Sequence, residues 1–119
     1  MQIEECYRLM GADYDDVLSR MMTNQRVYKF NKKFSENSDY KNLMESLSQN
    51  DFETAFRMAH NLKGMCLNLG YKELFEVTSV LCEELREGNP KGDINEMMDN
   101  VTVKYEKVLK GIGMMDDPS

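Results

Sequence analysis

The hydrophobic residues of this chain recur at helical spacing along nearly its whole length, and this constrains the fold more than any other feature. Within residues 51–69 the apolar positions fall three or four apart, which is the period of an α-helix. The apolar–polar alternation typical of strands is absent, and the only two prolines are Pro90 and Pro118. The pattern predicts an all-α protein.

Turn and capping residues divide this pattern into seven segments. Short polar side chains that can accept a hydrogen bond from the first turn of a helix precede most of them: Asp13, Thr23 or Asn24, Asp39, Asp51 and Asp93. Gly70 and Gly88 stand where left-handed residues end a helix. We therefore expect helices near 2–10, 13–22, 24–35, 39–49, 51–69, 72–87 and 93–112.

The short connections between these helices predict antiparallel neighbours. The expected architecture is an up-and-down antiparallel four-helix bundle with short accessory N-terminal helices. A chain of 119 residues suits one domain, which we place over residues 1–112 with a frayed tail at 113–119.

Charge and cysteine usage narrow the classes of partner and location. Fifteen basic and twenty-one acidic residues give a net charge of −6, which disfavours nucleic acid; we interpret the small basic patch of Arg26, Lys29, Lys32 and Lys33 as a solvated helix face. The N-terminus does not resemble a signal peptide, and no apolar run reaches the ~20 residues of a membrane span. The odd, widely spaced cysteines indicate reduced thiols in the cytoplasm and no metal site.

His60 is the only histidine of the chain, so it can work as a single nucleophile or proton carrier but not within a histidine cluster. In the helix predicted over 51–69, one apolar stripe forms the core face: Phe52, Ala55, Phe56, Ala59, Leu62, Cys66 and Leu69. A second stripe, rotated by roughly 110° at ~100° per residue, holds His60, Lys63, Gly64 and Leu67. His60 is therefore predicted to be exposed.

Two neighbours of His60 favour phosphoryl chemistry. Glycine inside a helix costs about 1 kcal/mol relative to alanine, and Gly64 lies one turn from His60 without any local reason for a kink. Its missing side chain leaves room for a large group to reach the imidazole. Lys63 places a cation on the same side, where it can stabilise phosphoryl oxygens.

The rest of a phosphoryl-transfer enzyme is missing from the sequence. It has no glycine-rich nucleotide loop, no Walker-type lysine and no evident set of magnesium-binding carboxylates. A phosphoryl acceptor without its own catalyst indicates a carrier whose chemistry is supplied by partners.

The run Ala59-His60-Asn61-Leu62-Lys63-Gly64, followed by Gly70, resembles the histidine-containing phosphotransfer (HPt) domain family. The resemblance covers about residues 10 to 110 and implies a four-helix bundle with accessory N-terminal helices. It implies that His60 exchanges a phosphoryl group with an aspartate of a receiver domain, that Lys63 stabilises that group and that Gly64 gives clearance. Asn61 is unusual at its position; Leu67 would belong to an apolar docking patch, and Arg86 could reach the phosphoryl region from the next helix.

The resemblance also implies the partners. These are response-regulator receiver domains and a sensor histidine kinase in a two-component system, met by a monomer with no cofactor of its own, and with Mg²⁺ on the receiver. The sequence leaves open the cognate kinase and receivers, the direction of phosphate flow, the downstream output, and whether the chain is a whole protein or part of a hybrid kinase.

Two other readings compete with the carrier. A non-phosphorylated module could keep the bundle and dock a receiver or kinase, but such members normally lose the histidine. An independent enzyme or metal site within the bundle is poorly supported by one histidine outside the core phase.

Overall fold

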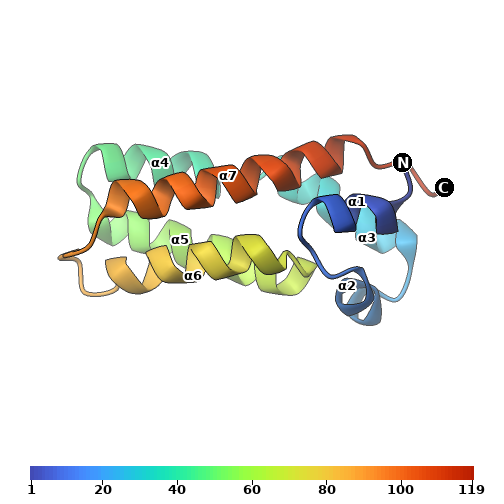
Figure 1. Cartoon of the computed structure of the whole chain (residues 1–119), viewed down its shortest axis with the longest axis horizontal. Coiled ribbons are helices and arrows are strands. Elements are labelled where there is room, and N and C mark those ends of the chain that lie inside the picture. Colours follow the sequence, from blue (N-terminus) through green and yellow to red (C-terminus); the bar gives the residue numbers. More distant parts are fainter.

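The computed structural model describes all 119 residues and contains helices but no strands. Seven helices follow one another, in the order shown in Figure 1: α1 (Ile3–Leu9), α2 (Tyr14–Met21), α3 (Asn24–Ser35), α4 (Asp39–Ser48), α5 (Phe52–Leu69), α6 (Lys72–Leu85) and α7 (Ile94–Gly113). The molecule is an elongated bundle of about 46 × 22 × 19 Å. The all-α bundle predicted from periodicity is confirmed.

Local capping chemistry explains most helix starts. The side chains of Asp13, Thr23, Asp51 and Asp93 accept hydrogen bonds from backbone N–H groups three residues on, at 3.0 to 3.2 Å. The prediction for Asp39 is wrong. It is the first residue of α4, and its own N–H donates to the Asn37 side chain.

Gly70 and Gly88 are both left-handed as predicted, but only Gly70 caps its helix, because the C-cap of α6 is Arg86. Gly70 ends α5 with φ of 75°, where an added Cβ would lie 2.7 Å from the Asp13 carbonyl oxygen. α6 ends at Leu85, two residues before its predicted end. The reason is Glu84, whose carboxylate accepts the N–H groups of Lys91 and Gly92 and folds the following loop back onto the last turn.

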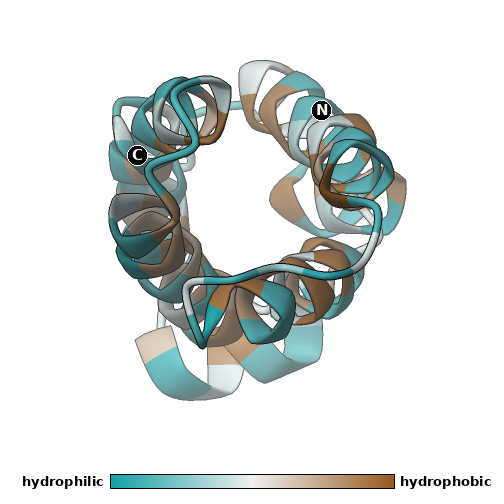
Figure 2. Ribbon diagram, turned by 90° about the vertical axis from the view of Figure 1, so that its left-hand side faces the viewer, coloured by the Kyte–Doolittle hydropathy of each residue, from teal (hydrophilic) through white to brown (hydrophobic).

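Two short helices, α3 and α4, together occupy one of the four helix positions of the bundle. α5 packs against α4 and α6, and α6 packs against α7. α3 lies beyond the end of the short α4 along the bundle and contacts α5 and α7 (Figure 1). Figure 2 shows the helices end-on around a common axis, with hydrophobic and hydrophilic residues on different sides of the ribbons. The apolar sides meet in one core of 25 buried hydrophobic residues, which include Cys6, Cys66 and Cys82 as free thiols.

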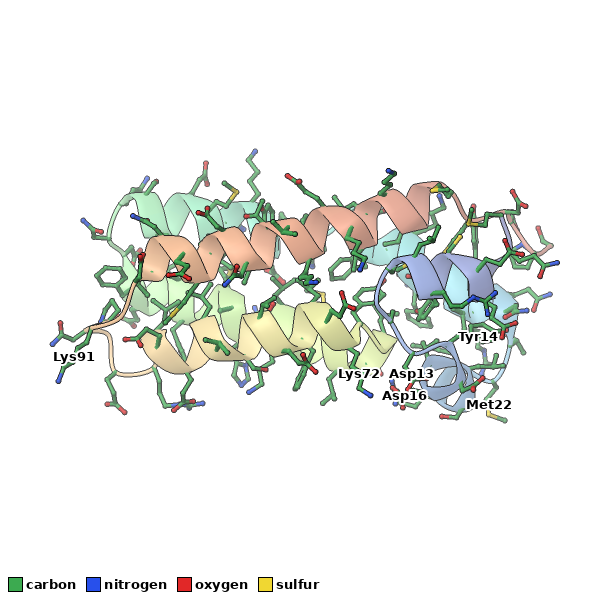
Figure 3. All side chains as sticks on the ribbon, viewed as in Figure 1. Asp13, Tyr14, Asp16, Met22, Lys72 and Lys91 are labelled. Atoms are coloured by element: carbon green, nitrogen blue, oxygen red, sulfur yellow. The ribbon has the colours of Figure 1, made fainter.

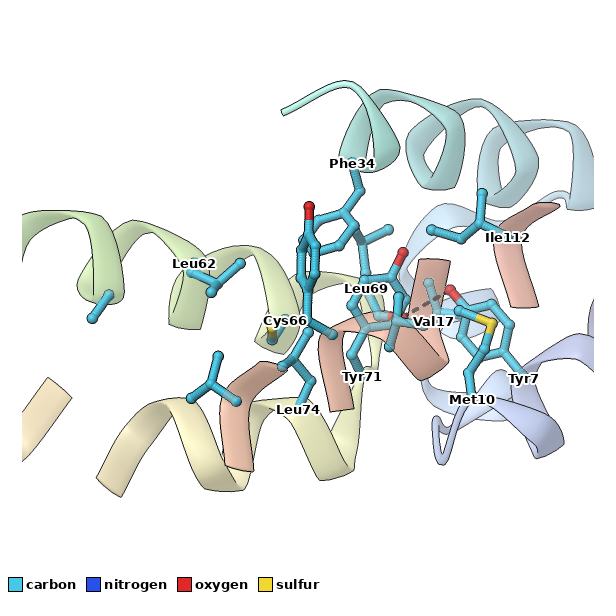
Figure 4. Close-up of a cluster of buried hydrophobic side chains, with 14 of the residues drawn as sticks. Tyr7, Met10, Val17, Phe34, Leu62, Cys66, Leu69, Tyr71, Leu74 and Ile112 are labelled. Carbon is cyan, nitrogen blue, oxygen red and sulfur yellow. Dashed lines mark hydrogen bonds between the residues drawn. The ribbon is translucent and has the colours of Figure 1, made fainter. Parts of the chain in front are cut away.

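A buried hydrogen-bond network joins the accessory helices to the bundle. Tyr7 donates to the carbonyl oxygen of Leu69 at 2.9 Å and accepts from the Asn31 amide at 2.9 Å, while Tyr71 donates to the Asn31 amide oxygen. Figure 4 shows Tyr7, Leu69 and Tyr71 within the apolar cluster that surrounds them. Burial raises the pKa of both tyrosines, so they stay neutral donors.

The C-terminal segment is attached to the N-terminus. α7 continues to Gly113, Met115 is buried, and the Asp116 carboxylate lies 2.8 Å from the Met1 amino group. The predicted tail of 113–119 therefore begins inside α7, and its first residues pack on the bundle because Met115 carries an apolar side chain into it.

Candidate functional site

The phase of α5 places His60 on the outside of the bundle. Its apolar stripe is buried as predicted at five positions: Ala55, Ala59, Leu62, Cys66 and Leu69. Phe52 and Phe56, predicted on the same stripe, are only partly buried. The His60 side chain is exposed and makes no hydrogen bond or ion pair within the chain, so its ring nitrogens face no internal competitor.

An open depression of about 460 Å³ lies beside the imidazole. Its lining includes His60, Asn61 and Arg57 from α5 and Arg86 from the end of α6. The structure therefore brings together three of the predicted site residues, His60, Asn61 and Arg86, on two helices.

Phe56 links the imidazole to the arginine within this depression. Its ring centroid lies 6.0 Å from that of His60, at an angle of 42° between the planes, and the Arg86 guanidinium stands over it at 5.4 Å. Such a distance suits a cation–π contact. Arg86 is also held by Glu83, whose carboxylate lies 3.0 Å from its Nε.

Lys63 lies on α5, one helical turn after His60, and its side chain reaches α6. Its ammonium stands over the Phe75 ring of α6 at 5.9 Å and has no carboxylate partner. The charges of Lys63 and Arg86 both act on the Cys82 thiol of α6 and lower its pKa, although burial raises it more.

Gly64 has open space above it. A Cβ atom built at this position would meet no other atom within 4 Å, apart from its own helix backbone and chain neighbours. Close packing against another helix therefore does not explain this glycine.

Leu67 lies apart from this depression, two turns along α5, and is 61% exposed. It lines a second hollow with Phe75 and Lys72 of α6 and with Asp13 and Asp16 of the accessory helices. Figure 3 shows these two aspartates beside Lys72, with Lys91 at the opposite end of the molecule. The two hollows share no lining residue, so the structure does not bring Leu67 together with His60, Asn61 and Arg86.

α2 fastens the end of the histidine helix next to Leu67. The Arg20 guanidinium donates to the carbonyl oxygens of Leu67 and Asn68 at 2.9 to 3.1 Å, and these belong to the last turn of α5, which has no helical partner for them. Asp16 holds the same guanidinium at 2.6 Å.

Sequence reasoning missed three residues of this site. Phe56 stands four residues before His60, so helical spacing alone could have indicated the contact between their rings. The ion pair of Glu83 with Arg86 also follows helical spacing, since the two residues are three positions apart. Phe75 contacts Lys63 across two helices, so only the pairing of α5 with α6 reveals it.

The structure contains no group of three His, Cys, Asp or Glu side chains that could hold a metal ion. No helix is long and apolar enough to cross a membrane.

Comparison with known families gives one match. A family model described as the Hpt domain matches residues 34–108, which is more than half of the chain and includes α4 to α6 and most of α7. Comparison with curated proteins and with solved structures gave no match.

Proposed function

This chain belongs to the Hpt domain family, and we propose that His60 is the residue on which it carries a phosphoryl group. Hpt domains are phosphoryl carriers in two-component phosphorelays and are not catalytic enzymes themselves. They interact with receiver domains and kinases. The observation that carries the assignment is the exposure of the only histidine beside a glycine with open space above it.

The proposed transfer exchanges one phosphorus bond for another. A receiver aspartyl phosphate loses its P–O bond, a P–N bond forms at an imidazole nitrogen of His60, the carboxylate leaves and the ring gives up its proton. The receiver supplies the catalysis, including the Mg²⁺ that neutralises charge on the transferring group. The reverse reaction uses the same groups.

Each neighbour of His60 has a role in this proposal. The Lys63 and Arg86 side chains can move from the rings of Phe75 and Phe56 to the phosphoryl oxygens. The exchange is favourable because a charge-assisted hydrogen bond contributes roughly 1.5–3 kcal/mol, whereas an exposed cation–π contact contributes about 0.5–1 kcal/mol. Gly64 gives clearance, Leu67 offers an apolar contact to the docked receiver, and Asn61 offers an amide at the edge of the depression.

Labelling tests the proposal directly. The wild type and His60→Gln are incubated with a phosphorylated receiver domain, and with phosphoramidate as a small donor. We expect an acid-labile, base-stable label on the wild type and none on His60→Gln, and Asn100→Ala, an exposed position on α7 outside the site, should be labelled as the matched surface control. Circular dichroism should show the same helix content in all three chains, since both positions are exposed.

A folded wild type that takes label from neither donor would refute the carrier role. That result would favour a module that docks a receiver or kinase without being phosphorylated.

A further inference from the structure

We infer that Glu83 opposes phosphorylation of His60 by holding Arg86, so that the carboxylate and the phosphoryl group compete for one guanidinium. This inference rests on the proposed function and adds a regulatory residue to it. Three contacts carry it: Arg86 over Phe56, Phe56 beside His60, and Glu83 on Arg86.

The geometry makes Arg86 a movable cation. Its side chain is 46% exposed and is held only by a planar ring and by a neighbour three residues away on the same helix. It already lines the depression that His60 lines. Rotation of its side chain can bring the guanidinium from the Phe56 ring to a group on the imidazole without a change in the helices.

Charge decides the direction of the exchange. A phosphoryl group carries up to two negative charges and three acceptor oxygens, and a carboxylate carries one charge. The guanidinium therefore favours the phosphoryl group, but it must first leave Glu83. The ion pair between Glu83 and Arg86 therefore lowers the equilibrium constant for phosphorylation of His60.

Lys63 and Arg86 differ in this respect. Lys63 has no carboxylate partner, so nothing but the Phe75 ring delays its movement. Arg86, in contrast, is restrained by its ion pair with Glu83. Glu87 is an exposed neighbour without an ion pair, which makes it a matched control for loss of one negative charge at the end of α6.

Equilibrium phosphorylation by phosphoramidate tests the inference without any receiver. The donor P–N bond breaks, the P–N bond to His60 forms, and ammonia leaves with the imidazole proton; ³¹P NMR gives the phosphorylated fraction at a fixed ratio of phosphoramidate to ammonia. We expect Glu83→Gln to raise the equilibrium constant about twofold, the size of an exposed helical ion pair. Arg86→Gln should lower it roughly fivefold, because a charge-assisted hydrogen bond is lost.

A double-mutant cycle isolates the pair. In the Arg86→Gln background, Glu83→Gln should not change the equilibrium constant for phosphorylation. Glu87→Gln, made in the wild-type chain, should also leave that constant unchanged. An unchanged constant in Glu83→Gln, an effect that persists without Arg86, or an equal effect in Glu87→Gln would overturn the inference and leave the carrier role intact. A wild type that takes a phosphoryl group neither from phosphoramidate nor from a phosphorylated receiver would instead refute the carrier role, and the inference with it.

Discussion

Polar side chains are in different environments in two regions of the molecule, the histidine face of α5 and the end of the bundle that α1 to α3 close. On the histidine face, His60 is exposed, and Lys63 and Arg86 contact aromatic rings. At the closed end, the side chains of Tyr7, Asn31 and Tyr71 are buried and hydrogen-bonded to one another. The polar side chains of the closed end are thus satisfied within the fold, whereas His60 has no hydrogen-bond partner in the chain.

The largest expected effect is a difference in unfolding free energy between substitutions of a buried asparagine, Asn31, and an exposed one, Asn61. Asn31→Ala leaves the hydroxyl group of Tyr71 without its acceptor and should destabilise the fold by about 3 kcal/mol. Asn61→Ala removes an exposed side chain and should change the unfolding free energy by less than about 0.5 kcal/mol. Urea unfolding measures both, and equal losses would erase the distinction between the regions.

Two helical glycines sharpen the same contrast. A Cβ at Gly111 in α7 would overlap the Cγ and Sδ atoms of the buried Met10, so Gly111→Ala should cost about 1–3 kcal/mol. A Cβ at Gly64 meets nothing, so Gly64→Ala should stabilise the helix by about 0.5–1 kcal/mol.

The stabilised Gly64→Ala chain should nevertheless exchange phosphoryl groups with a receiver more slowly, because its methyl group stands in the approach to His60. Thermal unfolding and labelling kinetics on one preparation test this. Faster or unchanged transfer would show that Gly64 gives no clearance.

The smallest expected effect depends on pH. The hydrogen bond from Arg20 lowers the pKa of Asp16 in the folded chain, with a further contribution from the charges of Arg20 and Lys72. Because the folded value is the lower one, the stabilisation is complete above the unfolded value of about 3.9 and is lost as pH falls through the folded value. The pair is partly exposed, so its contribution should stay below about 1 kcal/mol.

Urea midpoints between pH 5 and 2 check this prediction. The wild type should lose more stability on acidification than Asp16→Asn, while Asp15→Asn, which removes an exposed and unpaired carboxylate of the same helix, should follow the wild type. Parallel curves for wild type and Asp16→Asn would contradict it.

Local signals in the sequence predict most of the fold. Apolar periodicity locates all seven helices, and four side-chain caps act where predicted, because each depends on residues within one turn. The same periodicity predicts the exposure of His60. These features require no knowledge of which helices touch.

Features that join distant segments could not be predicted in this way. The Tyr7 to Asn31 to Tyr71 network spans up to 64 positions of the sequence and depends on how α1 and α3 close the bundle. The contact of Arg86 with Phe56 depends on the register of α6 against α5, which periodicity leaves undetermined. The roles of His60, Lys63, Gly64, Asn61, Leu67 and Arg86 in phosphotransfer stay predictions.

The pairing of the two termini has a consequence for protein engineering. The Met1 amino group and the Asp116 carboxylate are 2.8 Å apart, and the Asp116 N–H donates to the Met1 carbonyl oxygen. Both ends leave the molecule beside α1 and α3 (Figure 1). A short linker could therefore join them into a continuous backbone, and new ends could be opened in the loop between α6 and α7 to make a circular permutant. The same geometry would let the domain be inserted into a surface loop of a host protein with little disturbance of either fold.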